Sequence, residues 1–150
     1  MLRSQDNSIL VTIANDRAEM AVVAHALDRL GATHGIPREA LVALQVSVDE
    51  VVSNVIKYAW VDGAHQVHVR IGVLADGVEV EVVDDGRAFN PLDAPPPQAS
   101  SKTGERPVPG GVGIHMVRQL MDGIEYARKE ARNHTVLTKR CALQARDAEE

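Results

Sequence analysis

The spacing of hydrophobic and polar residues changes several times along the chain, and each change predicts a new secondary-structure element. Ser8 to Ile13 alternate loosely and are rich in β-branched residues, which predicts a strand. Asp16 followed by Glu19 has the spacing of a helix cap and a capping box. The helix that they open is expected to run through MAVVAHALDRL and to end between Gly31 and Gly35.

Two alternating segments further along the chain predict a β-hairpin. Gln66 to Leu74 and Val78 to Val83 both alternate hydrophobic and polar residues, and the dipeptide Asp76–Gly77 lies between them. An Asp-Gly dipeptide between alternating runs is a strong hairpin signal, because it favours the tight turn that matches the twist of paired strands.

The rest of the chain predicts a long loop and three further elements. Residues 93–113 are rich in Pro, Gly, Ser and Lys, and a loop of that length is usually functional or disordered. Gly113 to Met121 resume helical spacing, whereas Gly123 to Lys129 and Thr135 to Cys141 are expected as strands with a turn near residues 132–133. This order predicts an α/β fold, a two-layer sandwich in which one mixed, mainly antiparallel sheet is covered by helices on one face.

A second helix is expected over residues 37–60, with its proline in the first turn, and its two sides differ. The apolar arc expected to face the core comprises Leu41, Leu44, Val48, Val51, Val52, Val55 and Ala59. Glu50 and Asn54, four residues apart, share the opposite side with Ser47 and Lys57. That side is either an ordinary solvated face or part of a site. Asn is a poor residue for a helix interior, which weighs against the ordinary face.

Composition and charge restrict the class of protein. The 150 residues fit one domain over 1–150, with a charged tail near 143–150. The net charge of -5 argues against nucleic acid as a partner. No apolar run approaches the length of a membrane span, and the start MLRSQDN lacks the apolar core of a signal peptide. A single cysteine, Cys141, excludes an internal disulfide and fits a reducing, cytoplasmic location.

Two later motifs place chemistry at the ends of predicted elements. VVDDGRAFNP, residues 82–91, follows a buried strand, so Asp84 could accept a hydrogen bond from an exocyclic amine while Gly86 lets a flat ring approach. The same residues also fit an ordinary tight turn. In PVPGGVGIHMVRQLMD, residues 107–122, glycines precede a helix whose free N–H groups and dipole favour phosphate. A flexible joint before a helix explains this stretch equally well on its own.

Together and in this order, the motifs resemble the Bergerat ATP-binding fold shared by DNA gyrase, the Hsp90 chaperone, histidine kinases and the mismatch-repair protein MutL. The closer resemblance is to the small anti-sigma-factor serine/threonine-protein kinases of bacteria. It covers nearly the whole chain, as far as Lys139. It rests on EVVSNVIKYAW at 50–60, DDGRAFNP at 84–91, GGVGIHMVRQLMD at 110–122, YAR at 126–128 and NHTVLTK at 133–139.

The resemblance implies a role for each matching residue. Asn54 would hold Mg²⁺, and Glu50 would be the general base that takes the proton of an attacking hydroxyl. Asp84 would accept the adenine amine, with Thr135 supporting the same contact through water. Residues 93–109 would form a lid over ATP. Further nucleotide contacts would come from Lys57, Gly86, Ala88, Phe89, Gly110, Gly111, Val112, Gly113 and Ile114.

Some positions depart from the family's pattern or allow two interpretations. Ala88 and Asn90, beside the adenine motif, stand where the family often has Pro and Asp, and Tyr58 takes a place that is often histidine. Arg118, on the last predicted helix, is either a surface arginine or a contact to the γ-phosphate. These departures lie beside the motifs and leave the expected nucleotide site intact.

The resemblance implies a Mg²⁺-dependent kinase that phosphorylates an anti-sigma-factor antagonist and sequesters a sigma factor, so that phosphorylation controls partner choice. A homodimer is a further expectation from the family. The alternative is an ATP-gated protein-binding module that transfers no phosphate, because binding and transfer share every residue except the base. A motor ATPase or a sensor kinase needs a transducer domain or dimerisation helices, and neither is expected in 150 residues.

Overall fold

Residues 8–93 and 111–144 are described in the structure, which is a computed structural model. Their strands are β1 (Ser8–Ala14), β2 (Gln66–Leu74), β3 (Gly77–Asp84), β4 (Gly123–Lys129) and β5 (Arg132–Arg140). Their helices are α1 (Met20–His34), α2 (Arg38–Tyr58) and α3 (Gly111–Leu120), with short 3-10 turns η1 (Arg17–Glu19) and η2 (Pro91–Asp93). The expected lid beyond residue 93 and the expected tail beyond residue 144 lie outside the described residues.

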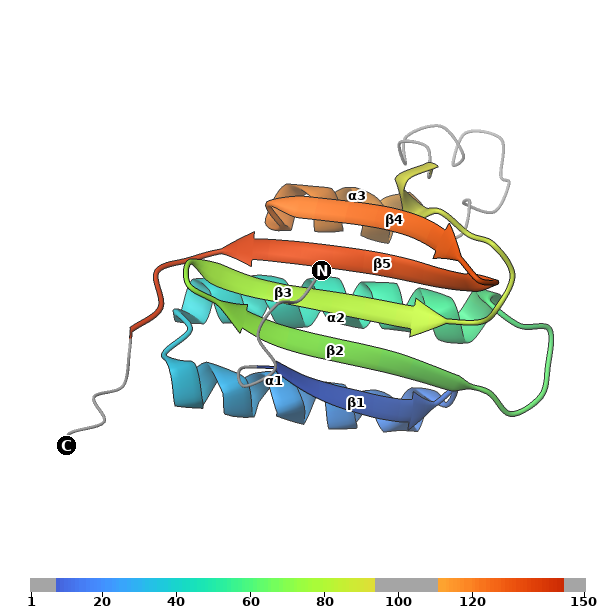
Figure 1. The fold of residues 1–150 in the computed structure, drawn as a ribbon, viewed down its shortest axis with the longest axis horizontal. Helices are drawn as coiled ribbons and strands as arrows, with labels where there is room; N and C mark the ends of the chain where they lie inside the picture. Colours follow the sequence, from blue (N-terminus) through green and yellow to red (C-terminus); the bar gives the residue numbers. More distant parts are fainter. Residues whose placement is uncertain (1–7, 94–110, 145–150) are drawn as a thin grey trace.

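The strands form one sheet in the order β1-β2-β3-β5-β4, and every neighbouring pair is antiparallel. Figure 1 shows α1, α2 and α3 together on one face of this sheet. The predicted two-layer α/β architecture is confirmed, although no parallel pair of the expected mixed sheet occurs among the described strands. None of the helices in the described part of the chain combines the length and the hydropathy of a membrane span.

The core lies between the sheet and the helices, and the predicted hairpin supplies much of it. β2 and β3 pair with Val69 opposite Val82 and Ile71 opposite Val80. All four side chains are at most 1% exposed, and burying a Val or Ile side chain contributes about 1.5–3 kcal/mol. Because a slip of one residue would turn every one of them to the other face, their burial fixes the register of the hairpin.

The entry to α1 differs in one detail from the predicted capping box. Asp16 caps the turn before the helix, because its side chain accepts a 3.0 Å hydrogen bond from the Ala18 N–H. Glu19 instead accepts a 3.0 Å hydrogen bond from the Ala14 N–H, at the end of β1. It therefore ties the turn to the sheet and does not cap Asp16 in return. Gly35 ends α1 at a φ of 67°, which is the left-handed conformation that glycine adopts without strain.

Part of the polar side predicted for α2 is buried. Ser47 is fully buried, and its Oγ has no hydrogen-bond partner among the described residues. Asn54 is 6% exposed, Glu50 is half-buried and only Lys57 is exposed. The expectation for Ser47 was wrong because elements outside α2 cover this position, and a helical wheel of one helix cannot show its neighbours.

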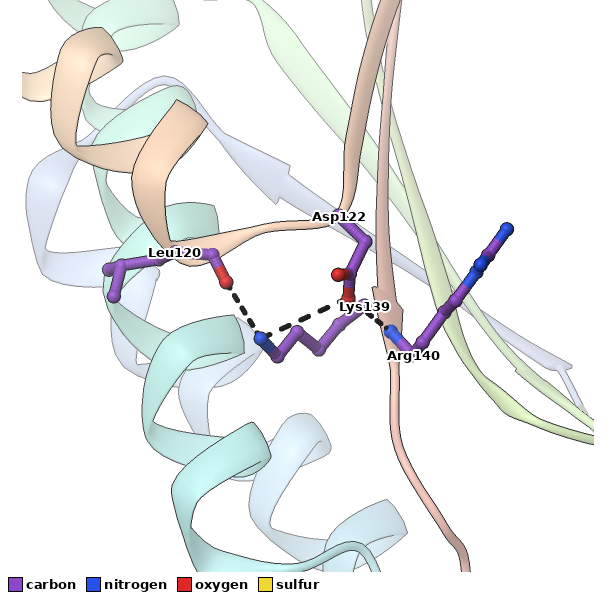
Figure 2. A network of polar contacts seen from close by, with 4 residues as sticks. All are labelled: Leu120, Asp122, Lys139 and Arg140. Atoms are coloured by element: carbon purple, nitrogen blue, oxygen red, sulfur yellow. Dashed lines mark hydrogen bonds and ion pairs between the residues drawn. The ribbon is translucent and has the colours of Figure 1, made fainter.

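Figure 2 shows how the end of α3 is fastened to β5. Lys139 Nζ donates a 2.8 Å hydrogen bond to the Leu120 carbonyl and lies 3.9 Å from Asp122 Oδ2. The same carboxylate oxygen accepts a 2.7 Å hydrogen bond from the Arg140 N–H. A cation beside the last carbonyls of a helix is favourable, because those carbonyls lack partners within the helix. These contacts hold the C-terminal end of α3 at β5, and the helix also packs against α2.

The final hairpin turns slightly earlier than the sequence suggested. Its turn lies at Glu130 and Ala131, which have φ values of 54° and 63°, and not near residues 132–133. Asn133 therefore belongs to β5 and pairs with Asp84 of β3. It is 3% exposed on the helix-covered side, so a residue expected in a turn is part of the buried sheet.

Candidate functional site

A pocket opens at the end of the sheet where β3 finishes, between α2, α3 and β5. Its space, including the open solvent at its mouth, is about 390 Å³. The lining residues are Val51, Asn54, Val55, Tyr58, Ala59, Asp84, Arg87, Phe89, Pro91, Ile114, Asn133 and Thr135. The pocket therefore brings together residues from four motifs that lie apart in the sequence.

Asp84 is the buried carboxylate of this pocket, with 4% of its surface exposed. One oxygen, Oδ1, accepts a 2.8 Å hydrogen bond from the Gly86 N–H and a 2.9 Å hydrogen bond from Asn133 Nδ2. The other oxygen, Oδ2, accepts no hydrogen bond from the described residues. Asp84 can therefore accept a hydrogen bond from a ligand without giving up those it already has.

Burial has an electrostatic cost at this residue. Desolvation raises the pKa of the Asp84 carboxyl above its ordinary value of 3.8, although the hydrogen bonds from Asn133 and Gly86 oppose the shift. The folded protein then holds this proton more tightly than the unfolded chain does. As the pH rises from the ordinary value through the raised pKa, the contribution of Asp84 to the free energy of unfolding therefore falls.

We expect Asp84→Asn to be at least as stable as the unmodified protein at neutral pH. The amide oxygen keeps both hydrogen bonds at Oδ1, and the buried charge disappears. Urea denaturation at a series of pH values above about 4 should show a stability difference that grows in favour of the variant as the pH rises through the raised pKa. Asp62→Asn, which replaces an exposed carboxylate that does not contribute to the pKa shift of Asp84, is the control and should show no such growth. A loss of stability at pH 7 in Asp84→Asn would contradict this account.

Gly86 lies in close contact with the end of α2. A Cβ added to it would come within 2.4 Å of Ala59 Cβ and 2.5 Å of the Ala59 carbonyl oxygen. The next residue, Arg87, donates a 2.9 Å hydrogen bond from its N–H to the same carbonyl. Glycine is thus required here for close backbone packing, a reason that its position in the sequence did not reveal.

Glu50, Asn54 and Gly113 form the other end of the site. Asn54 Nδ2 donates a 3.1 Å hydrogen bond to Glu50 Oε2, so the two side chains expected to act together are in contact. A Cβ added to Gly113 would lie 1.9 Å from Glu50 Cδ and Oε2. The Glu50 carboxylate therefore lies against the first turn of α3, where backbone N–H groups lack partners within the helix and the dipole is positive.

The remaining residues predicted for the site fall into three groups. Phe89, Ile114 and Thr135 line the pocket, and Thr135 lies in β5 opposite Val82 of β3. Lys57 and Ala88 are exposed and are not among the residues that line it. Gly110 lies outside the described residues, and Gly111 and Val112 are placed only as the start of α3.

Arg118, for which two interpretations were open, is exposed on α3 and reaches back toward the adenine motif. Its Nη2 donates a hydrogen bond to the carbonyl of Leu92 in η2. This contact fastens α3 to the segment that follows Asn90. The side chain is thus on the surface, in agreement with the first of the two interpretations, and it has a partner within the chain.

Several lining residues were not predicted as site residues. Val51, Val55 and Ala59 were expected only as core, and Tyr58, Arg87 and Pro91 only as neighbours of motif residues. Asn133 was missed because it was placed in a turn. Its alternation with Thr135 and Leu137 was a usable signal, because residues two apart in a strand face the same side, and all three are buried.

Comparison with known sequences identifies relatives over most of the chain. The model of the family described as "Histidine kinase-like ATPase domain" matches residues 13–139. The serine/threonine-protein kinase BtrW of Bordetella bronchiseptica is 30% identical over 101 residues, which cover 66% of this chain and 70% of that protein. The serine-protein kinase RsbW of Bacillus subtilis is 25% identical over 124 residues, or 79% of this chain and 74% of that one.

Solved structures share the fold. The RsbU and RsbW domains of a Mycobacterium tuberculosis protein align with a TM-score of 0.65 and 16% identity, over 93% of this chain and 34% of that longer chain. The histidine kinase domain of a blue-light-activated histidine kinase from Erythrobacter litoralis aligns with a TM-score of 0.52 and 21% identity, over 83% and 60% of the two chains. With the family match over residues 13–139, the chain belongs to the histidine kinase-like ATPase domain family, and its relatives are small bacterial serine kinases, as its motifs predicted.

Proposed function

We propose that this protein binds ATP with Mg²⁺ in the pocket between α2, α3 and β5, and that it transfers the γ-phosphoryl group to a serine or threonine of another protein. The observation that carries the proposal is the contact of Glu50 with both Asn54 and the first turn of α3. It joins a base and a helix N-terminus to Asn54, and Asn54 lines the same pocket as Asp84.

The Asp84 end of the pocket suits an adenine ring. Asp84 Oδ2 has no hydrogen-bond donor among the described residues and would accept the exocyclic amine. Phe89 and Ile114 give the pocket apolar walls for the ring. Thr135, on the neighbouring strand and 6% exposed, would support the amine contact through water.

The Asn54 end fits a magnesium ion by the chemistry of its donors. Because Asn54 Nδ2 is bonded to Glu50, its Oδ1 is the atom left over, and no described residue donates to it. An amide oxygen is a hard ligand of the kind that Mg²⁺ accepts beside water and phosphate. When bound, the ion would neutralise phosphate charge, which is the largest requirement of phosphoryl transfer.

Glu50 would act as the general base. The proton of the acceptor hydroxyl would pass to the Glu50 carboxylate as the hydroxyl oxygen bonds to the terminal phosphorus, and ADP would leave with the electrons of the broken O–P bond. A base of this kind contributes roughly 10²- to 10⁴-fold to the rate. Gly111 and Gly113, at the start of α3, would contact the phosphates through their backbone, together with Gly110 and Val112.

The partners follow from the family. The relatives named BtrW and RsbW are protein kinases, and the acceptor in this proposal is a small anti-sigma-factor antagonist. Unphosphorylated antagonist would bind this protein, and phosphorylation would release it, which frees the protein to bind a sigma factor. We further propose that it acts as a homodimer in the cytoplasm, where ATP is available.

A titration with a fluorescent ATP analogue tests the site directly. The unmodified protein should bind the analogue more tightly with Mg²⁺ than without it. Asn54→Ala should weaken binding in Mg²⁺ by about 10-fold or more, the scale of loss seen when a metal site is disturbed, and should bind equally with and without the ion. Asn15→Ala, at an asparagine that does not line the pocket and bonds Gly63 and His65, serves as the control. Absence of binding by the unmodified protein would overturn the proposal.

The alternative, an ATP-gated binding module, makes the same prediction for that titration. Incubation with γ-labelled ATP and the antagonist separates the two functions. Label on a serine or threonine of the antagonist supports the kinase. Mg²⁺-dependent ATP binding with no label transferred would support the gated module and leave Glu50 without a role as base.

A further inference from the structure

Asn133 makes more hydrogen bonds than any other described side chain that lines the proposed adenine pocket. Its amide nitrogen uses both of its hydrogens within the chain. Nδ2 donates a 2.9 Å hydrogen bond to Asp84 Oδ1 and a 2.8 Å hydrogen bond to the Arg87 carbonyl. One bond therefore holds the buried carboxylate, and the other holds the backbone of the loop that follows it.

The amide oxygen of Asn133 is held from the opposite side by three donors. The hydroxyl of Tyr126 and Arg128 Nη1, both from β4, donate to Asn133 Oδ1, the latter at 3.1 Å. The Phe89 N–H approaches the same oxygen at 3.4 Å. Because three donors converge on this oxygen, the amide cannot turn over without losing them, and its nitrogen must face Asp84.

Asn133 therefore fixes the orientation of the Asp84 carboxylate. With one oxygen held by Asn133 and by the Gly86 N–H, the carboxylate cannot rotate freely about its last bond. The other oxygen has no donor among the described residues, and Asp84 lines the pocket. An ionised carboxylate oxygen fixed in this way attracts an N–H donor and repels a carbonyl oxygen.

We propose that Asn133 is a positioning residue that sets the preference of the pocket for purines with an amino group at C6 over purines with a carbonyl group there. Asn133 does not touch the base in this proposal and acts through Asp84. The inference rests on the proposed function, because it assumes that the base of a nucleotide lies against Asp84. It assigns base selection to the junction of β3 and β5, outside the residues that the motifs marked as binding the base.

The test compares ATP with inosine triphosphate, which carries the carbonyl group at C6 and is otherwise nearly identical. Dissociation constants are measured by calorimetry with Mg²⁺ for the unmodified protein, Asn133→Ala and Asn15→Ala. The unmodified protein should prefer ATP. Asn133→Ala should reduce that preference by about 10-fold or more, because a hydrogen bond to a charged group contributes on this scale. ATP binding should weaken while inosine triphosphate binding changes little.

The control and the outcomes separate positioning from general damage. Asn15→Ala removes an amide with the same kind of backbone contacts, 3.1 Å to the Gly63 carbonyl and 3.0 Å from the His65 N–H, and should keep the full preference. If Asn133→Ala weakened both nucleotides by the same factor, Asn133 would be only structural and the inference would be overturned. If the unmodified protein bound neither nucleotide, the proposed function itself would fail.

A second variant keeps the test decisive if Asn133→Ala does not fold. Asn133→Asp preserves the shape and the acceptor for Tyr126 and Arg128 but removes both N–H donors. Two facing carboxyl groups share a proton, so the charge on Asp84 that favours an amino group is reduced and its carboxyl group is no longer held by an N–H donor at position 133. The preference for ATP should fall again, and an unchanged preference in this variant would also overturn the inference.

Discussion

Replacing Glu50 with Gln is expected to slow phosphoryl transfer to the antagonist by about 10²- to 10⁴-fold, with ATP affinity nearly unchanged. The Gln amide oxygen can still accept the hydrogen bond from Asn54 Nδ2, so the local structure is preserved. An amide cannot take the proton of the acceptor hydroxyl, however. Single-turnover transfer from γ-labelled ATP measures the rate, and a nucleotide titration measures the affinity separately.

Asp49→Asn is the matched control for this experiment. Asp49 precedes Glu50 in the same helix and carries the same charge, but it is exposed. Its substitution should leave the transfer rate within about twofold, because long-range effects of one exposed charge are largely screened. Full activity in Glu50→Gln would remove Glu50 from the role of base. Equal losses in both variants would point to a charge effect on the helix and not to proton transfer.

Gly86→Ala is expected to destabilise the fold by about 1–3 kcal/mol, the usual cost of forcing atoms into a packed site. The added methyl group would meet the Ala59 carbonyl oxygen at 2.5 Å. Backbone atoms cannot move aside as cheaply as the end of a flexible side chain. The hydrogen bond from the Arg87 N–H to that carbonyl would also be disturbed. Urea denaturation measures the change, seen as a lower midpoint with little change in slope.

Gly123→Ala provides a control with the opposite expected sign. A Cβ at Gly123 would lie 3.5 Å from Thr138 Cβ, which is an ordinary contact. Because alanine restricts the unfolded chain, this substitution should be neutral or stabilising by up to about 1 kcal/mol. If Gly86→Ala were as stable as Gly123→Ala, the contact between the β3–η2 segment and α2 would be looser than the structure shows.

Local patterns predicted the elements well, because each depended on its own residues. The hairpin of β2 and β3 followed from alternation around Asp76–Gly77, and α1 ended within the expected glycines. What local patterns missed were contacts between distant segments. Ser47 is covered by elements outside α2, and Gly86 is constrained by Ala59 of another element. Neither neighbour is visible from the sequence surrounding these residues.

Only part of the candidate site could be predicted, for the same reason. The motifs marked Asn54, Asp84 and Ile114, and the structure brings all three into one pocket. The apolar walls were missed because a wall residue such as Val55 has the same sequence pattern as any core residue. Asn133 was missed because a shift of two residues in a turn decides whether a side chain is buried in a sheet or exposed in a loop.

The raised pKa of Asp84 has a consequence for protein engineering. Sequence design that optimises only folding free energy on this backbone would replace Asp84 with a neutral residue such as Asn, since burial penalises the charged carboxyl. Such a design would gain thermal tolerance and lose the acceptor that the proposed nucleotide requires. Positions where the most stable residue and the native residue disagree are useful guides to function, and on this backbone Asp84 is such a position.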